Sequence, residues 1–141
     1  MSDGPWPLAL LQHTGSKEGP HFDLLLATEA HPAPQERCAL TWRTAMRLHE
    51  LMIGARVALV PIARHRACYL TLSEPCSLDQ DRGTVAPMAI GRWLPLPDGG
   101  AELSWAPHAS PMIVRFIDAD GAVDARDSAR LVNAIAIERR E

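Results

Sequence analysis

Two histidines and an aspartate near the start of this 141-residue chain have an arrangement that could bind a metal ion. His21 and Asp23 are two residues apart, so their side chains point to the same side of an extended strand. His13 precedes them, and the glycine-containing segment 15–20 can turn the chain back between the two histidines. Imidazole nitrogen and carboxylate oxygen are donors that Mn²⁺, Fe²⁺ and Zn²⁺ accept. The spacing predicts a divalent metal site at His13, His21 and Asp23; the alternative is that His21 and Asp23 only pair at a strand edge.

Two neighbouring strands would position these side chains. Residues 8–13 have the pattern of a short strand that ends at His13, and residues 21–27 that of its antiparallel neighbour. His21 and Asp23 would then face a pocket. The apolar residues that alternate with them are expected to face the core: Phe22, Leu24 and Leu26.

Short segments of strand character continue along the chain, separated by proline and glycine. They cover residues 38–43, 57–62, 67–72, 83–90, 92–96, 101–105 and 111–118. Helical spacing is limited to residues 44–55, which predict a short helix or helical turn, and residues 127–138, where Asp127 and Ser128 could cap a C-terminal helix. Many short strands are typical of barrels and sandwiches. We therefore predict an all-β fold: a small, closed or nearly closed antiparallel β-barrel with one or two short peripheral helices.

Length and composition indicate one ordinary globular domain over residues 1–141. The chain is 47% hydrophobic and 22% charged, without an apolar run long enough to cross a bilayer. Its N-terminus lacks the basic start and apolar middle of a secretory signal, so we expect a cytoplasmic protein with no membrane partner. The three cysteines include no Cys-x-x-Cys pair, which argues against a disulfide framework and a structural zinc site.

The charge distribution is more informative than the net charge of −3. Residues 37–92 contain eight arginines against four acidic residues, so the middle of the chain is basic. The planar guanidinium group of arginine suits bidentate contact with phosphate. A phosphate-bearing partner is therefore the kind of ligand that this segment favours.

Several short motifs occur in a recognisable order. They are His13, His21-Phe-Asp23, Thr41-Trp42, His65-x3-Tyr69, Glu74 and Asp81-Arg-Gly-Thr-Val85. In this order, residues 7–105 resemble the 3′-phosphoesterase domain of bacterial DNA ligase D. Residues 106–141 would be a C-terminal extension.

The resemblance implies a small β-barrel in which His13, His21 and Asp23 bind the catalytic metal, usually Mn²⁺, with Zn²⁺ or Fe²⁺ as alternatives. It also implies that His65 and Tyr69 contact the substrate phosphate. The family trims 3′ ends of DNA during end repair, removing a terminal ribonucleoside and then the 3′-phosphate. DNA or RNA-tailed DNA 3′ ends are the partners implied, with a separate ligase or polymerase as a possible protein partner.

The sequence departs from the family pattern at three points, the first being that the acidic and basic residues found upstream of the first histidine in the family have no clear counterpart in the twelve residues before His13. Seven residues separate the first two histidines where the family has five, and Leu25 stands where the family has an arginine. That arginine would bind phosphate, so its loss predicts weaker activity unless another cation replaces it. Arg43, which follows Trp42 on a strand expected nearby, is the first candidate, and Arg82 is the second.

Other interpretations remain open from the residues alone. His21, Asp23 and a distant His65 also have the order of the two-histidine, one-carboxylate site of non-haem Fe(II) oxygenases. The two readings differ in whether His13 or His65 is the third ligand. A non-catalytic module that binds nucleic-acid ends is a third possibility, favoured by Leu25. His65 and Tyr69 could also be a histidine at a bend and a half-buried tyrosine.

Overall fold

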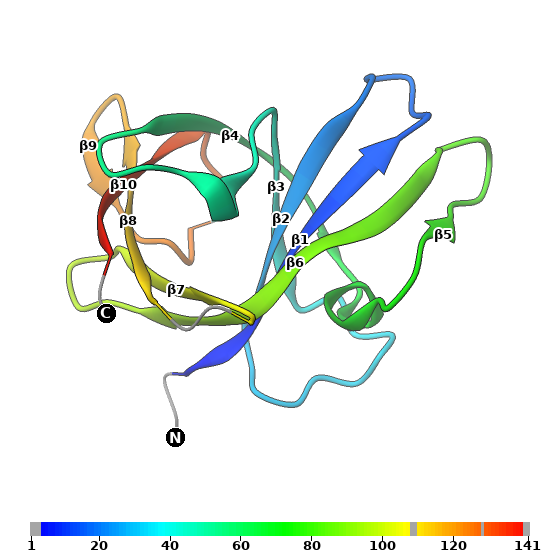
Figure 1. Ribbon diagram of the computed structural model, residues 1–141, viewed down its shortest axis with the longest axis horizontal. Coiled ribbons are helices and arrows are strands. Elements are labelled where there is room, and N and C mark those ends of the chain that lie inside the picture. Colours follow the sequence, from blue (N-terminus) through cyan, green and yellow to red (C-terminus); the bar gives the residue numbers. More distant parts are fainter. Residues whose placement is uncertain (1–3, 108–109, 128, 140–141) are drawn as a thin grey trace.

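The structure is a computed structural model and describes residues 4–107, 110–127 and 129–139. Two short 3-10 helices, η1 (Leu48–Glu50) and η2 (Ala67–Thr71), accompany the strands (Figure 1). The strands are β1 (Trp6–Thr14), β2 (His21–Ala27), β3 (Ala39–Thr44), β4 (Arg56–His65), β5 (Cys76–Ser77), β6 (Thr84–Pro95), β7 (Ala101–Trp105), β8 (Met112–Asp118), β9 (Gly121–Val123) and β10 (Val132–Arg139).

The strands form a closed antiparallel barrel, which confirms the predicted fold class. Eight of them follow one another in the order β1-β2-β3-β4-β10-β8-β7-β6, and β6 pairs with β1 to complete the ring. Every pairing between the described strands is antiparallel. Two short strands lie outside the ring: β5 pairs with β6, and β9 with β8. In Figure 1, β1, β2 and β6 run beyond the barrel and end together on one side.

The barrel interior is built by one of the two faces of each strand. Trp42 on β3 and Phe116 on β8, which are separated in the sheet by β4 and β10, have ring centroids 5.7 Å apart. They must therefore meet across the interior. Leu24 lies opposite Trp42 in the β2–β3 register and is also buried, as the alternating pattern predicts. The indole Nε1–H of Trp93 donates to the carbonyl of Ala27 at 2.9 Å, which ties β6 to the end of β2.

The opposite face of β1 and β2 lies outside the barrel, and it is also covered. Helix η2 packs against both strands there, with Ala67 and Leu70 buried (Figure 1). The main-chain N–H groups of Ala67 and Cys68 donate to the carbonyls of Glu36 and Pro34, which attach η2 to the preceding loop. Asp23 shares this outer face with the residues two positions away along its strand. The site predicted from the sequence therefore lies on the outside of the barrel wall.

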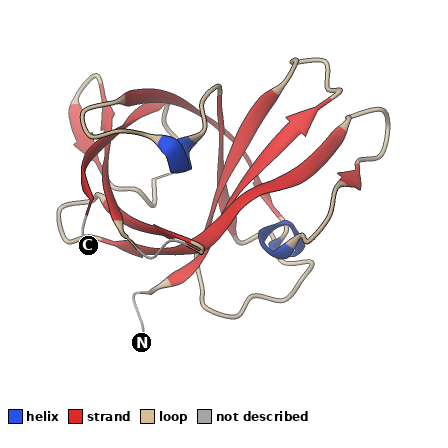
Figure 2. Cartoon of the chain, viewed as in Figure 1, coloured by secondary structure: helices blue, strands red, loops and turns tan. Residues whose placement is uncertain are grey.

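Two of the expected local elements are wrong, whereas the helical turn expected within residues 44–55 is present as η1. Residues 132–138 are not a helix but part of β10, which lies between β4 and β8 and is needed to close the barrel; Ser128 lies outside the described residues. Residues 67–72, predicted as a strand, form η2 instead. Within residues 44–55 only η1 is helical, and Figure 2 shows how little helix there is.

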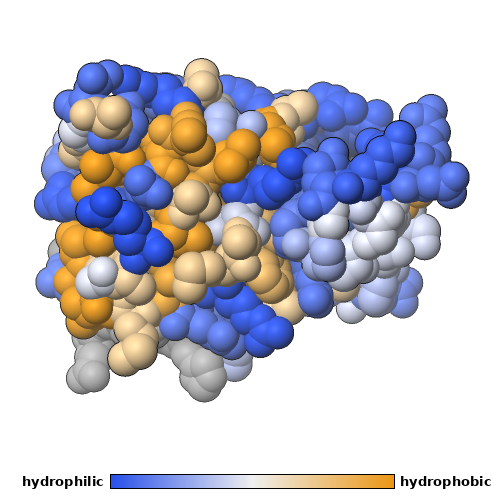
Figure 3. Space-filling view, turned by 90° about the horizontal axis from the view of Figure 1, so that it is seen from above, coloured by the Kyte–Doolittle hydropathy of each residue, from blue (hydrophilic) through white to orange (hydrophobic). Residues whose placement is uncertain are grey.

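Segment 44–55 acts as a cover on the barrel rather than as a helix. Leu48 and Leu51 are buried, while Met52 and Ile53 are exposed. Backbone hydrogen bonds of residues 54 and 55 with Ala136 on β10 hold the segment in place. Figure 3 shows that apolar surface gathers toward one end of this face of the molecule, whereas the other end is hydrophilic.

None of the helices in the described part of the chain is long and apolar enough to cross a membrane. The three cysteines are free, as expected from their spacing.

Candidate metal centre

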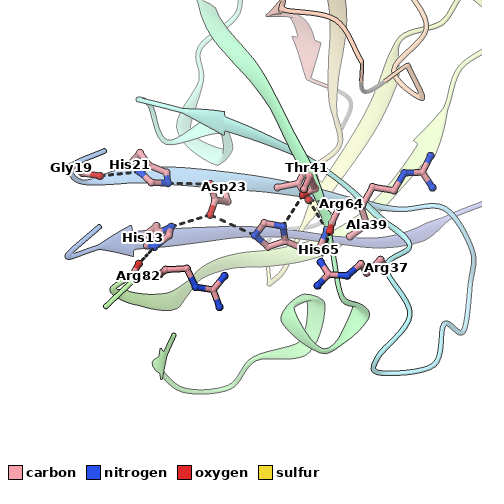
Figure 4. Close-up of polar contacts among 11 residues, drawn as sticks. His13, Gly19, His21, Asp23, Arg37, Ala39, Thr41, Arg64, His65 and Arg82 are labelled. Atoms are coloured by element: carbon pink, nitrogen blue, oxygen red, sulfur yellow. Dashed lines mark hydrogen bonds and ion pairs between the residues drawn. The ribbon is translucent and has the colours of Figure 1, made fainter. Parts of the chain in front are cut away.

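Asp23 is the centre of the site. Its side chain is 1% exposed, and its two oxygens face two different histidines (Figure 4). Oδ2 lies 3.4 Å from Nδ1 of His13, and Oδ1 lies 3.3 Å from Nε2 of His21. His13 and His21 are directly opposite one another in the β1–β2 register, which explains why the two rings meet. The ligand atoms of the three residues lie within 4.8 Å of one another and could hold a metal ion.

Main-chain carbonyl groups fix which nitrogen of each histidine faces the aspartate. Nε2 of His13 lies 2.7 Å from the carbonyl oxygen of Arg82, and Nδ1 of His21 lies 2.9 Å from that of Gly19. A carbonyl oxygen can only accept a hydrogen bond, so both of these ring nitrogens carry the hydrogen. In the neutral rings the other nitrogens, Nδ1 of His13 and Nε2 of His21, then present lone pairs to Asp23. Carbonyl groups commonly orient metal-binding histidines in this way.

The cluster contains acceptors without donors. Nε2 of His21 and Oδ1 of Asp23 are buried and have no hydrogen-bond partner among the described residues. A buried polar group left unpaired typically costs about 1–3 kcal/mol. A divalent cation between the lone pairs and the carboxylate would satisfy both atoms. Bonds of about 2.0–2.1 Å in a tetrahedral arrangement place neighbouring ligand atoms about 3.4 Å apart, close to the two distances of 3.4 and 3.3 Å between the histidines and Asp23.

Arg43 lies beside this cluster. It is directly opposite Asp23 in the β2–β3 register, so both side chains are on the same face of the sheet. Its Nε is buried and has no hydrogen-bond partner among the described residues. Arg43, His13, His21 and Asp23 all line one cavity of about 390 Å³. Two further cations, Lys17 and Arg82, line the same cavity, so an anion could bind next to the metal site.

Glu18 also lines the cavity, and its charge interacts with that of Arg43. Its pKa is lowered, first by a backbone hydrogen bond and then by the charge of Arg43 and a hydrogen bond from Ser16. Glu18 is therefore ionised at neutral pH and partly offsets the charge of Arg43. An anion that enters the cavity would compete with it for the guanidinium group.

His65 also reaches the cavity, at the end of β4. Its Nδ1 lies 3.1 Å from the carbonyl oxygen of Ala63, and its Nε2 lies 3.9 Å from Oδ2 of Asp23. Burial lowers the pKa of His65, because the cost of desolvating the imidazolium exceeds the stabilisation by the Ala63 carbonyl and by Asp23. Tyr69 packs its ring against His65, with centroids 5.7 Å apart, but is not among the residues that line the cavity.

Leu25 occupies a position from which an arginine side chain would not line the cavity. Its side chain has no exposed surface, it lies between Ala9 and Thr41 in the sheet, and it does not line the cavity. A guanidinium group there would be buried away from the cavity. Arg43, the predicted replacement, lies one strand further along and does line it.

Residue types alone do not indicate the carbonyl groups of Gly19, Ala63 and Arg82, because any residue type can supply one. The sequence does contain the loop that supplies the last of them, as the motif from Asp81 to Val85. In this loop Gln80 and Asp81 both have positive φ angles, of 60° and 55°, which non-glycine residues seldom adopt. Such strain is common where a loop is shaped for a site.

The chain has no match among the family models, the curated proteins or the solved structures with which it was compared.

Proposed function

We propose that this barrel is a divalent-metal-dependent phosphoesterase that acts on 3′ ends of DNA in end repair, with Mn²⁺ as its metal. It would remove a 3′-phosphate or a 3′-terminal ribonucleoside. One observation supports this proposal above all others. His21 and Asp23, which carry the buried acceptors, and Arg43, whose Nε is buried without a hydrogen-bond partner among the described residues, line the same cavity. Metal-dependent hydrolysis of a phosphate ester requires a site for the metal cation next to a site for the phosphate anion.

The residues divide this work between them. His13, His21 and Asp23 would hold the ion, which would supply Lewis acidity toward a phosphate oxygen and would make water more acidic. Arg43 would bind the phosphate and stabilise the charge that develops on it, since its guanidinium group can make two parallel hydrogen bonds to phosphate oxygens. Lys17 and Arg82, at the rim, would attract the nucleic-acid backbone. Removal of a terminal ribonucleoside would break the bond between phosphorus and the 5′ oxygen of that nucleoside and leave a 3′-phosphate. Removal of the 3′-phosphate would then break the bond between phosphorus and the 3′ oxygen, with water supplying the new oxygen of the released phosphate and the proton of the 3′-hydroxyl group.

The test is release of phosphate from a 3′-phosphorylated DNA oligonucleotide annealed to a template, with Mn²⁺ present. The parent protein should release phosphate, and chelation of the metal should stop the reaction. Asp23→Asn keeps the shape of the side chain but removes its charge, so it should abolish turnover. Arg43→Ala should lower the rate by about 10²–10³-fold, the usual effect of losing one preorganised donor. Glu102→Gln, a carboxylate on β7 outside the cluster, is the matched control and should leave the rate unchanged.

Two results would overturn the proposal. If the Mn²⁺-loaded protein binds 3′ ends of DNA but releases nothing, the barrel is a non-catalytic end-binding module. If it ignores nucleic acid but binds Fe²⁺ and consumes O₂ with an oxo-acid, it is an oxygenase. A variant Asp23→Asn with the full parent rate would show that the hydrolysis takes place elsewhere.

A further inference from the structure

A second cavity continues from the cavity of the metal centre. Its volume is about 420 Å³, and Glu18, His21 and Arg43 line both cavities. Volumes of about 300–1,000 Å³ are typical of sites for small organic groups. A phosphate ester that binds at Arg43 therefore has space into which its organic part can extend.

Strand register sets the order of the side chains along this path. Asp23 on β2 lies directly opposite Arg43 on β3, and Arg43 lies directly opposite Val60 on β4. Directly opposite residues share a face of the sheet, so the three side chains form a row across its outer surface. Neighbouring strands are about 4.8 Å apart, which makes the row roughly 10 Å long. The carboxylate of the metal centre is at one end, the guanidinium group is in the middle, and an aliphatic side chain is at the other end.

The end of the row away from the metal centre is an apolar wall. Six large apolar side chains are exposed in the described part of the chain, and two of them, Met46 and Val60, line the second cavity. They are 48% and 43% exposed. Ala58 lies two residues before Val60 on β4, is also exposed and lines the same cavity. Of the charged residues that line it, only Arg56 is not shared with the metal cavity. A ligand with an anion on one side and a ring of low polarity on the other would suit these surroundings.

We propose that the second cavity binds the nucleoside whose 3′ oxygen carries the phosphate. This inference rests on the proposed function and deepens it, because it concerns the part of the substrate beyond the phosphate. With the phosphate at Arg43, the metal centre is on one side of it and the wall of Met46 and Val60 is on the other. The nucleoside on this side is present both in a 3′-phosphate end and in an end with a terminal ribonucleoside. Met46 and Val60 would then contact its sugar and base and favour nucleic-acid ends over simple phosphate esters.

Equilibrium binding to the Mn²⁺-loaded protein tests the proposal without turnover. The probes are two fluorescent single-stranded oligonucleotides of the same sequence. Each ends in a 3′-phosphonate, in which carbon replaces the ester oxygen and prevents hydrolysis. One has a base on its last nucleotide, and the other has an abasic residue there. The parent protein should bind the first about 10-fold more tightly, within the range expected for contact with one base.

A double variant identifies the side chains responsible. Val60→Ser together with Met46→Ala removes the apolar contact and should bind the two oligonucleotides nearly equally. Its affinity for the abasic oligonucleotide should stay that of the parent protein, which also shows that the variant is folded. Ile90→Ser together with Met52→Ala changes the same amount of exposed apolar surface outside the second cavity and should keep the parent's preference.

Three results would overturn the proposal. The first is equal binding of the two oligonucleotides by the parent protein, and the second is an unchanged preference in the variant of Val60 and Met46. The third is equal weakening of both oligonucleotides in that variant, because the two side chains would then act on the phosphate or on the fold.

Phosphate release from the ordinary ester separates this proposal from the proposed function. Release without any preference for the terminal base would support the phosphoesterase and overturn the nucleoside subsite. A preference for the base without release would support the subsite and overturn the phosphoesterase.

Discussion

The surroundings of Asp23 show which features of the candidate metal site single residues predict and which they do not. The types and spacing of His13, His21 and Asp23 were enough to predict a metal site, because the strand period fixes which side chains share a face. The hydrogen bonds that select the metal-facing nitrogen of each ring come from main-chain carbonyl groups. Their positions depend on how the loops close, which residue types do not encode. The orientation of the histidine rings therefore could not be predicted from the sequence and is known only from the structure.

Arg43 also shows that part of the site could not be predicted from the sequence alone. It was predicted as a substitute cation because it follows Trp42 on a strand expected nearby, and its place beside Asp23 comes from the strand register. It lies directly across from Asp23, whereas Leu25 is buried between two strands. Register between strands depends on turn lengths and packing, so a single sequence indicates it only weakly.

His49 should make stability depend on pH. Burial lowers its pKa, while Glu50 raises it and Arg47 lowers it further, and its Nδ1 is buried without a hydrogen-bond partner among the described residues. The unfolded chain therefore takes up a proton at this histidine more readily than the folded protein does. Its contribution to stability is present above the ordinary pKa of 6.5 and is lost as the pH falls below it.

Urea unfolding of the metal-free protein at pH 7.5 and pH 5.5 measures this effect. His49→Leu removes the titrating group and should lose less stability between the two pH values than the parent protein does. His31→Leu, at an exposed histidine, should keep the parent's pH dependence. Equal losses in His49→Leu and in the parent would mean that His49 does not contribute.

At the scale of elements, the errors came from short apolar runs. Val132, Ala134 and Ala136 are the buried positions of β10 and have the period of a strand, but the small residues around them also fit a helix. Residues 67–72 alternate like a strand, yet η2 is bound through its backbone to the loop before it. In both segments, contacts with distant parts of the chain determine the secondary structure. Strand β2 was predicted with the bounds that it has in the structure, because His21 and Asp23 alternate with Phe22 and Leu24 and glycine and proline precede the strand.

Gly83 connects the loop of Arg82 to β6, and its replacement should weaken metal binding without touching a ligand. Its φ angle is +92°, and a Cβ atom there would collide with the main chain of Thr14 and Gly15. Gly83→Ala should therefore shift the Arg82 carbonyl away from Nε2 of His13. Loss of such a supporting contact typically lowers metal affinity by about 10–100-fold.

Gly121→Ala is the matched control for this change. Gly121 also has a positive φ, of +116°, but nothing lies within 4 Å of the position of its Cβ, and it is on β9 away from the site. Titration calorimetry with Mn²⁺ should show weakened binding in Gly83→Ala and normal binding in Gly121→Ala. If both variants bind Mn²⁺ equally well, the Arg82 carbonyl does not position His13.

For the whole molecule, the predicted fold class was correct although two of its elements were not. Alternating strands and frequent turns indicate an antiparallel β protein from local sequence alone. The strand order is not local: β10, near the end of the chain, pairs with β4 and β8. The barrel therefore closes through contacts between distant segments, which a strand pattern does not specify. The outer face of the closed wall then carries the site, with η2 and the β5–β6 loop beside it.

The most direct test of the metal centre is an anomalous-difference map from crystals soaked in Mn²⁺. We predict one peak at bonding distance, about 2.0–2.2 Å, from Nδ1 of His13, Nε2 of His21 and a carboxylate oxygen of Asp23. A well-diffracting crystal that shows no peak between these three residues at saturating Mn²⁺, or shows its peak elsewhere, would contradict the assignment.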